Sequence, residues 1–297
     1  MPDVPSVAFI GLGNMGVPMA ARLLAAGYDV TGFDRSETAS ASFQSLGGAV
    51  ARSAAEAASG RDVVILMLPN SDVVDLIAAE VRPYLTPGQT LIDMGSSEPA
   101  RTRALARSLA ESELVLLDAP VSGGVRSAET GALTIMVGGD SHARPGVDAL
   151  LAQLGRTRDV GLVGSGHAIK ALNNLLSAAH FWLTSEVVAI GSRLGIEPEV
   201  LLDVVNASSG RSGSSEAKWP RFVLPGTFDS GFEAELMLKD VKIAVQLAED
   251  LALPTELGGR LAELWQEALQ SLAPHADHTE IAKVIMGRVS PLAGLTT

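Results

Sequence analysis

The chain has 297 residues, with 22 lysines and arginines against 34 aspartates and glutamates, a formal net charge of −12. This acidic balance argues against a nucleic-acid duplex or an anionic membrane as the main partner. Cysteine is absent, which removes disulfides, thiol nucleophiles and thiolate metal ligands together. The length predicts two domains, and 47% hydrophobic with 19% charged residues indicate a globular chain.

Hydrophobic runs in the chain are short. The longest clean run, residues 63–68, is far below the roughly 20 residues that a membrane-spanning helix needs. The first residues lack the basic flank of a signal peptide, and glycines interrupt the apolar stretch that follows. We therefore expect a cytoplasmic protein with no membrane partner.

The first half of the chain alternates between short apolar runs and segments with helical spacing. Strands are predicted at residues 7–10, 29–33, 63–68, 90–93 and 114–118, with additions at 133–137 and 158–160. Helices are predicted between them at residues 14–26, 36–44, 73–81 and 99–111. Apolar strands that alternate with helices indicate an α/β domain with a parallel sheet covered on both faces.

The second half shows no such alternation. Residues 167–194 form one long, mostly apolar stretch without proline, which as a helix would extend about 42 Å. A helix that is apolar on most sides is buried in a domain or in a subunit interface. Further helices are predicted at residues 198–205, 234–250, 255–269 and 279–286. We thus predict an all-α domain of residues 165–297 after a first domain of residues 1–164, and a homodimer or homotetramer closed by helix packing.

A glycine motif opens the first predicted helix. It reads Gly11-Leu12-Gly13-Asn14-Met15-Gly16 and follows a predicted strand, the context that gives G-x-G-x-x-G its value as a dinucleotide signature. Gly11 permits the tight turn, Gly13 lets a pyrophosphate approach the backbone, and Gly16 lets the helix pack on the strand. The free N–H groups at the helix start then face the phosphates. The motif predicts a doubly wound dinucleotide-binding (Rossmann) domain.

The choice between NAD and NADP depends on the end of the second strand. Asp34 lies 18 residues after Gly16, where an acid hydrogen-bonds the ribose hydroxyls and repels a 2′-phosphate. This favours NAD. Arg35 stands beside it and could hold such a phosphate, so NADP stays possible.

Two further segments carry polar groups suited to a substrate. Ser122, Gly123 and Gly124 follow a predicted strand at the carboxyl edge of the sheet; their hydroxyl and unshielded N–H groups suit a carboxylate, although a plain turn is an equal reading. Lys170 and Asn174 are four residues apart and share a face of the long helix. A lysine there either extends to solvent or acts as a catalytic amine.

Taken together, these motifs resemble the β-hydroxyacid dehydrogenase family, a 6-phosphogluconate dehydrogenase-like group that includes 3-hydroxyisobutyrate dehydrogenases and tartronate semialdehyde reductases. The resemblance covers essentially the whole chain. It includes residues 11–30, MLP at 67–69, DAPVSGG at 118–124, GALTIMVGG at 131–139, the segment from Lys170 to Asn174, SSGRSGSSE at 208–216 and LMLKD at 236–240.

The resemblance implies an oxidoreductase that moves a hydride between a nicotinamide cofactor and a small β-hydroxy acid or its semialdehyde. Lys170 matches the family's catalytic lysine and Asn174 the asparagine that holds the substrate beside it. Ser122, Gly123 and Gly124 match the turn that grips the substrate carboxylate. The remaining matches concern the cofactor: Lys239, which reaches it from the helical domain, and Leu68, Pro69 and Ser96 on the nicotinamide side.

The chain departs from the family at Gly95, where many members have serine, and this affects the hydrogen bonds expected near the nicotinamide ribose. Two alternatives remain: an imine reductase, although these usually lack a lysine at the position of Lys170, and a non-catalytic dinucleotide-binding scaffold. No metal is expected, because His275 and His278 lack a ligand set. Three further groups of side chains are considered for function. Arg211 is expected either in the substrate pocket or in a solvated loop. Trp219 and Phe232 are expected in the core or an interface, and His167 and His180 are expected to be structural.

Overall fold

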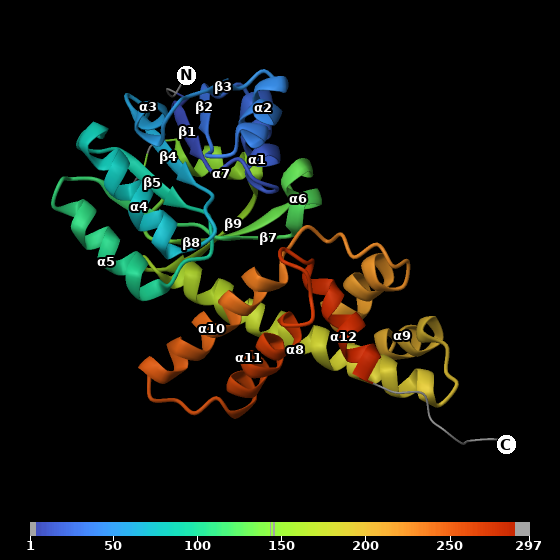
Figure 1. The fold of residues 1–297 in the computed structure, drawn as a ribbon. Helices are drawn as coiled ribbons and strands as arrows, with labels where there is room; N and C mark the ends of the chain where they lie inside the picture. The colour runs from blue at the N-terminus through green and yellow to red at the C-terminus, as the bar shows by residue number, and fades with distance from the viewer. Residues whose placement is uncertain (1–3, 143, 145, 289–297) are drawn as a thin grey trace. The chain divides into compact units, whose positions relative to one another are not determined.

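A computed structural model of the chain describes residues 4–142, 144 and 146–288. The chain divides into two compact units, Met1–Lys170 and Ala171–Thr297, called here the N-terminal and C-terminal units. The long helix α8 (Ser165–Arg193) begins in the first and continues in the second (Figure 1). It begins two residues before and ends one residue before the predicted helix 167–194.

The N-terminal unit is built on a sheet to which the described residues contribute nine strands, in the order β3-β2-β1-β4-β5-β6-β8-β7, with β9 paired to β8. The strands are β1 (Val7–Ile10), β2 (Val30–Phe33), β3 (Ala49–Val50), β4 (Val63–Leu66), β5 (Thr90–Asp93), β6 (Val115–Asp118), β7 (Val121–Ser122), β8 (Leu133–Gly138) and β9 (Gly155–Gly161). Strands β1 to β6 pair in parallel, whereas β8 runs antiparallel to β6 and β7. The strand order reverses at β1, which confirms the doubly wound sheet and creates a switch point where ligands bind.

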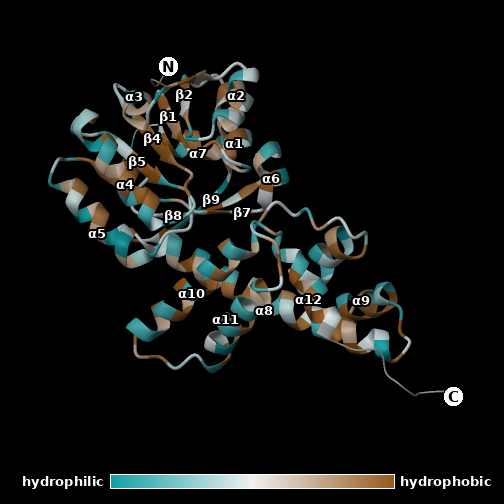
Figure 2. Ribbon diagram, viewed as in Figure 1, coloured by the Kyte–Doolittle hydropathy of each residue, from teal (hydrophilic) through white to brown (hydrophobic). Residues whose placement is uncertain are grey.

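The strands β1, β4, β5 and β6 are buried on both faces, as their apolar runs predict. Successive residues of a strand point to opposite faces; accordingly Val7 and Phe9 belong to one apolar cluster and Ala8 and Ile10 to the other. The helices that cover the faces are α1 (Gly16–Ala25), α2 (Glu37–Ser45), α6 (Gly124–Thr130) and α7 (Val147–Leu154) on the first, and α3 (Ala54–Ala58), α4 (Ser71–Val81) and α5 (Pro99–Ala110) on the second. A short helix η1 (Arg82–Tyr84) follows α4. Figure 2 shows the brown, hydrophobic strands β1, β4 and β5 between helices with teal outer surfaces.

The described elements of the C-terminal unit are helical, which confirms the predicted all-α region. After α8 come α9 (Pro198–Asn206), the π-helix η2 (Ser214–Val223), α10 (Ala234–Asp250), α11 (Glu256–Leu269), η3 (His278–Glu280) and α12 (Ile281–Arg288). Aromatic side chains fill its core: the rings of Trp182 and Trp265 lie 6.4 Å apart, and Phe181 is fully buried. None of the described helices is long and apolar enough to traverse a bilayer.

Candidate active site

The glycine loop between β1 and α1 has an internally packed part and an open part. A Cβ on Gly11 would lie 2.2 Å from the Met67 carbonyl oxygen, and one on Gly16 only 1.9 Å from that of Gly11. Nothing lies within 4 Å of a Cβ built on Gly13. Gly11 and Gly16 are therefore required by the packing of strand, turn and helix, while Gly13 leaves the backbone open to a ligand. These are the roles that a dinucleotide-binding loop needs.

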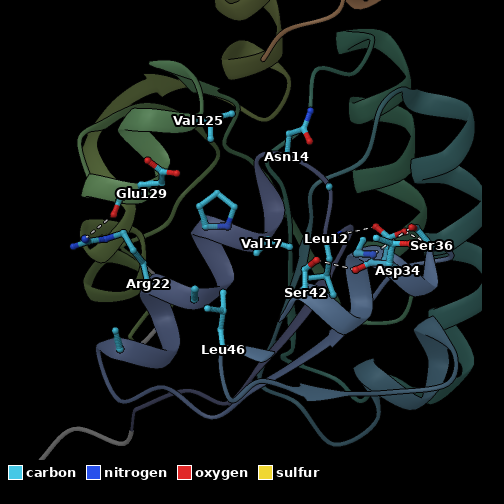
Figure 3. A pocket seen from close by; sticks show the side chains of 16 residues that line it. Leu12, Asn14, Val17, Arg22, Asp34, Ser36, Ser42, Leu46, Val125 and Glu129 are labelled. Atoms are coloured by element: carbon cyan, nitrogen blue, oxygen red, sulfur yellow. Dashed lines mark hydrogen bonds between the residues drawn. The ribbon is translucent and has the colours of Figure 1, made fainter. Parts of the chain in front are cut away.

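Asp34 follows β2 and contacts this loop directly. Its Oδ2 accepts a hydrogen bond of 2.7 Å from the Leu12 N–H and its Oδ1 one of 2.7 Å from the Ser36 N–H (Figure 3). The neighbouring Arg35 is exposed. An open loop with an ordered acid beside it fits the pyrophosphate and ribose of a nicotinamide dinucleotide, so these residues suit the cofactor that the sequence predicts.

A groove of about 880 Å³ extends from the glycine loop along α1. Gly13, Asn14 and Asp34 line its start, and residues of α1, α2 and α6 line the rest together with Leu46, which follows α2, as Figure 3 shows for Val17, Leu46 and Glu129. Arg22 closes one side, where its Nε donates to the Gln153 carbonyl oxygen at 2.8 Å. The groove is therefore continuous with the predicted cofactor loop.

The residues predicted on the nicotinamide side follow the neighbouring strands. Leu68 and Pro69 come after β4, and Ser96 after β5. A Cβ on Gly95 would lie 2.5 Å from the Leu68 carbonyl oxygen, and the Gly95 N–H donates to Asp93 Oδ1 at 2.9 Å. The departure at Gly95 thus has a physical reason, because the two chain segments approach too closely for a side chain.

The predicted carboxylate-binding turn lies at the far side of the same sheet. Ser122 ends β7 and pairs with Thr134 of β8. Gly123 and Gly124 have φ of +132° and +70°, a region that favours glycine, and both are exposed. The backbone of the turn is therefore unshielded by side chains. Lys170 is half-buried in the second turn of α8 and is the last of the predicted residues in the N-terminal unit.

Asn174 and Lys239 belong to the C-terminal unit, where one carboxylate joins them. Asn174 is only 5% exposed, and its Nδ2 donates to Asp240 Oδ2 at 2.5 Å. The other oxygen of this fully buried carboxylate lies 3.0 Å from Lys239 Nζ. A buried charge needs such a partner. Asp240 was not among the residues predicted from the sequence, although its place next to Lys239 in LMLKD was a signal.

The remaining candidate residues differ in whether they are buried or exposed. Trp219 is buried and Phe232 packs on the apolar cluster of the C-terminal unit, so both are core residues there. Arg211 and His180 are exposed and His167 is buried. Among the described residues, Glu233, Glu235 and His275 form a cluster with metal-ligand chemistry, but its exposure is typical of a solvated ion pair.

Two family models match the chain in tandem. Residues 6–164 match the NAD-binding domain of 6-phosphogluconate dehydrogenase, and residues 164–285 match the NAD-binding domain of NADP-dependent 3-hydroxyisobutyrate dehydrogenase. The chain belongs to the β-hydroxyacid dehydrogenase family. Members of this family are NAD(P)-dependent oxidoreductases that act on small hydroxy acids, so the resemblance read from the motifs is confirmed.

The similarity extends over whole chains of this family. The 2-(hydroxymethyl)glutarate dehydrogenase of Eubacterium barkeri is 32% identical, over 94% of either chain. An NAD-dependent L-serine dehydrogenase of Pseudomonas aeruginosa is 35% identical, over 94% of this chain and 97% of its own. The structure of Mycobacterium tuberculosis 3-hydroxyisobutyrate dehydrogenase with L-serine matches with a TM-score of 0.87 and 30% identity, over 95% of this chain and 99% of its own. Imine reductases match with TM-scores of 0.60 to 0.65, a likeness that shows the fold alone.

Proposed function

We propose that this β-hydroxyacid dehydrogenase oxidises short 3-hydroxy acids with a primary hydroxyl, HOCH₂–CHR–COO⁻, to their semialdehydes, and catalyses the reverse reduction. The proposal is carried by the whole-length similarity to enzymes named for three such acids. 3-Hydroxyisobutyrate, L-serine and 2-(hydroxymethyl)glutarate share this skeleton and differ only in R. The common part is a carboxylate and a primary alcohol whose carbon atoms are two bonds apart, and the site must recognise that part first.

Each end of this skeleton has candidate partners in the chain. The Ser122 hydroxyl and the open backbone of Gly123 and Gly124 would bind the carboxylate. Asn174 would donate to the substrate oxygen, with its amide oriented by Asp240. Holding both ends of the substrate fixes the reacting carbon, which is the main contribution of positioning to such a reaction.

Lys170 is the proposed proton acceptor. A bound nicotinamide cofactor would supply the hydride acceptor for the hydroxyl-bearing carbon. Lys170 takes the hydroxyl proton as the C–O bond becomes a carbonyl, and returns that proton to the oxygen in the reduction. We assign Lys239, with Leu68, Pro69 and Ser96, to the cofactor, as the family resemblance implies.

NAD is the proposed cofactor. Asp34 supports this choice, because two backbone N–H groups hold its carboxylate at the end of β2, where a negative charge repels a 2′-phosphate. Arg35 keeps NADP as the alternative. We further propose a homodimer, with a tetramer as the alternative, and a cytoplasmic location, for which the absence of cysteine is the support.

Lys170→Ala tests the proposed function. Initial rates are measured with NAD and NADP over 3-hydroxyisobutyrate, L-serine and 3-hydroxypropionate, with 3-hydroxybutyrate as a secondary alcohol for comparison. We expect turnover of the primary alcohols with NAD, and a loss of about 100-fold or more in kcat in the variant. NADH affinity, followed by fluorescence titration, should stay within about twofold of the wild-type value, since Lys170 is assigned to the substrate.

The matched control is Lys242→Ala, which removes an exposed lysine of α10 and should retain the wild-type rate. Wild-type turnover in Lys170→Ala would remove the mechanism. Turnover of the secondary alcohol alone would remove the substrate class and leave the proton acceptor in place.

A further inference from the structure

Two buried carboxylates meet the first turn of α8. Asp93 ends β5 and Asp118 ends β6, and the two are register partners in the sheet. Their exposed fractions are 1% and 0%. Neither carries a role in the proposed reaction, yet a buried carboxylate is costly unless it is paired or hydrogen-bonded. Its partners therefore indicate what it holds in place.

Asp118 caps α8 from the neighbouring strand. Its Oδ1 accepts from the Gly164 N–H at 2.7 Å and its Oδ2 from the His167 N–H at 2.9 Å. Both donors lie at the start of α8, where backbone N–H groups have no partner within the helix. Each carboxylate oxygen thus binds one of them, at the positive end of the helix dipole.

Glycines let the helix approach this carboxylate closely. A Cβ on Gly166 would lie 2.3 Å from the Met136 carbonyl oxygen and 2.9 Å from Asp118 Oδ2. On the opposite side, a Cβ on Gly138 would lie 2.3 Å from Asp118 Oδ1. The carboxylate therefore sits between β8 and the first turn of α8 with no room for a further methyl group. This packing fixes how far the helix stands from the sheet.

His167 fixes the same turn from a second direction. Its Nδ1 lies 2.8 Å from Thr102 Oγ1, and that hydroxyl donates to the Glu98 carbonyl oxygen at 3.1 Å. Because a hydroxyl has one hydrogen, Thr102 must accept from the Nδ1–H. His167 Nε2 faces Asp93 Oδ2 at 3.6 Å. The imidazole thus connects the first turn of α8 to α5 through the Thr102 hydroxyl.

We propose that Asp118, assisted by His167, is a positioning residue for Lys170. This inference rests on Lys170 being the proton acceptor of the proposed function. Lys170 lies one helical turn after His167, so both project from neighbouring positions on α8. A lysine side chain is long and flexible, and the backbone from which it starts sets the region that its amine reaches. Asp118 fixes that starting point.

Asp118 also links the proton acceptor to the carboxylate-binding turn. It lies four residues before Ser122 on the same segment from β6 to β7, while its side chain holds the helix of Lys170. The substrate's carboxylate and hydroxyl are a fixed distance apart, so the two protein groups that meet them must also keep a fixed separation. One buried side chain, between these two parts of the N-terminal unit, meets that requirement.

Asp118→Asn tests the inference. The variant keeps the shape of the side chain and one acceptor, but turns an amide N–H toward one of the two helix donors. We expect kcat per NADH-binding site to fall about tenfold, with NADH affinity within about twofold of wild type. The apparent pKa in the pH profile of kcat should also move. A purely structural role would lower the fraction of active enzyme and leave both normalised readouts unchanged.

The matched control is Asp62→Asn at the start of β4. Asp62 also accepts two hydrogen bonds, from the Ser6 N–H at 2.8 Å and the Ser6 hydroxyl at 2.7 Å, but it contacts neither α8 nor the segment of Ser122. It should keep the wild-type normalised kcat and pH profile. Wild-type values in Asp118→Asn as well would overturn the inference.

Thr102→Val serves if Asp118→Asn fails to fold. This near-isosteric change leaves the His167 Nδ1–H without its acceptor, and we expect the normalised kcat to fall about threefold with the same direction of change in the pH profile. An unchanged kcat and profile there would equally overturn the inference. Lys170→Ala separates the two proposals: if it keeps wild-type turnover, the proposed function fails, whereas loss in Lys170→Ala with no effect in Asp118→Asn or Thr102→Val refutes the positioning role alone.

Discussion

His278 is a buried imidazole in the C-terminal unit. Its Nδ1 lies 3.1 Å from the Phe232 carbonyl oxygen and 3.0 Å from Ser230 Oγ. Burial, and then the nearby Lys218 ammonium, lower the pKa of His278 to about 3, although the Asp277 carboxylate acts in the opposite direction. The folded protein therefore holds this histidine neutral over the range in which a histidine in an unfolded chain takes up a proton.

The free energy of unfolding should consequently depend on pH through His278. The unfolded imidazole binds a proton as the pH falls below about 6.5, whereas the folded one does not until about 3. The contribution is complete above pH 6.5 and is lost progressively as the pH falls toward 3. We expect the urea midpoint to drop between pH 7 and pH 5, and this drop to shrink in His278→Asn, which keeps a donor for Phe232.

The control for this histidine is His180→Asn. His180 is exposed on α8 and its replacement should leave the pH dependence of the urea midpoint as in the wild type. An equally steep dependence in His278→Asn would show that other groups cause it.

At the scale of elements, the glycines of the turn between β1 and α1 have different roles: Gly16 is required for packing, whereas Gly13 is open to a ligand. A Cβ on Gly16 would clash with the Gly11 carbonyl oxygen at 1.9 Å, whereas one on Gly13 meets open space. Gly16→Ala should therefore destabilise the fold by about 1–3 kcal/mol or more. Gly13→Ala should unfold at nearly the wild-type temperature but bind NADH more weakly, because its methyl group occupies the approach of the pyrophosphate.

Circular dichroism melting and NADH fluorescence titration, applied to both variants, check this contrast. Each alanine serves as the control for the other, since the chemical change is identical. Equal losses of melting temperature in the two variants would contradict the division of roles within the glycine loop.

Elements with a strong local pattern could be predicted from the sequence. The expected helix at residues 234–250 coincides with α10, and the glycine motif is recognisable because all of its residues are contiguous. The π-helix η2 was not predicted. It contains Pro220, which argues against a helix interior, and it follows a segment rich in serine and glycine, which indicates a loop.

Contacts between residues far apart in the sequence could not be predicted from local sequence patterns. Asp118 bonds to His167 across 49 positions, and Asn174 to Asp240 across 66. No periodicity connects such pairs, because the sheet order and the packing of α8 on α10 bring them together. Lys170 and Asn174 could be singled out as polar residues in an apolar helix and by the family resemblance of their segment, whereas Asp240, the partner of Asn174, became visible only with the fold.

At the scale of the whole molecule, the apolar surface of α8 is the feature that the single chain leaves unexplained. The α8 stripe consists of Leu172, Leu176, Leu183, Val187, Ile190 and Leu194, with exposed fractions of 44% to 74%. Steps of three, four and seven residues place them along one side of the helix. A contiguous exposed apolar surface marks an interaction site, and the two-fold packing of identical helices is the simplest way to cover it.

Leu183→Glu tests the proposed homodimer. Burying a leucine in the interface contributes about 1.5–3 kcal/mol to association, and in a two-fold dimer the substitution is present in both subunits. The loss of about 3 kcal/mol or more weakens association by about 100-fold or more, and a buried, unpaired glutamate adds to this cost. We expect sedimentation velocity at micromolar concentration to show dimers or tetramers for the wild type and monomers for the variant. Leu257→Glu, at a leucine of α11 that is 87% exposed and outside the α8 stripe, should sediment as the wild type does. A wild-type chain that sediments as a monomer, or a Leu183→Glu variant that still assembles, would show that the α8 stripe is not the interface of a homodimer.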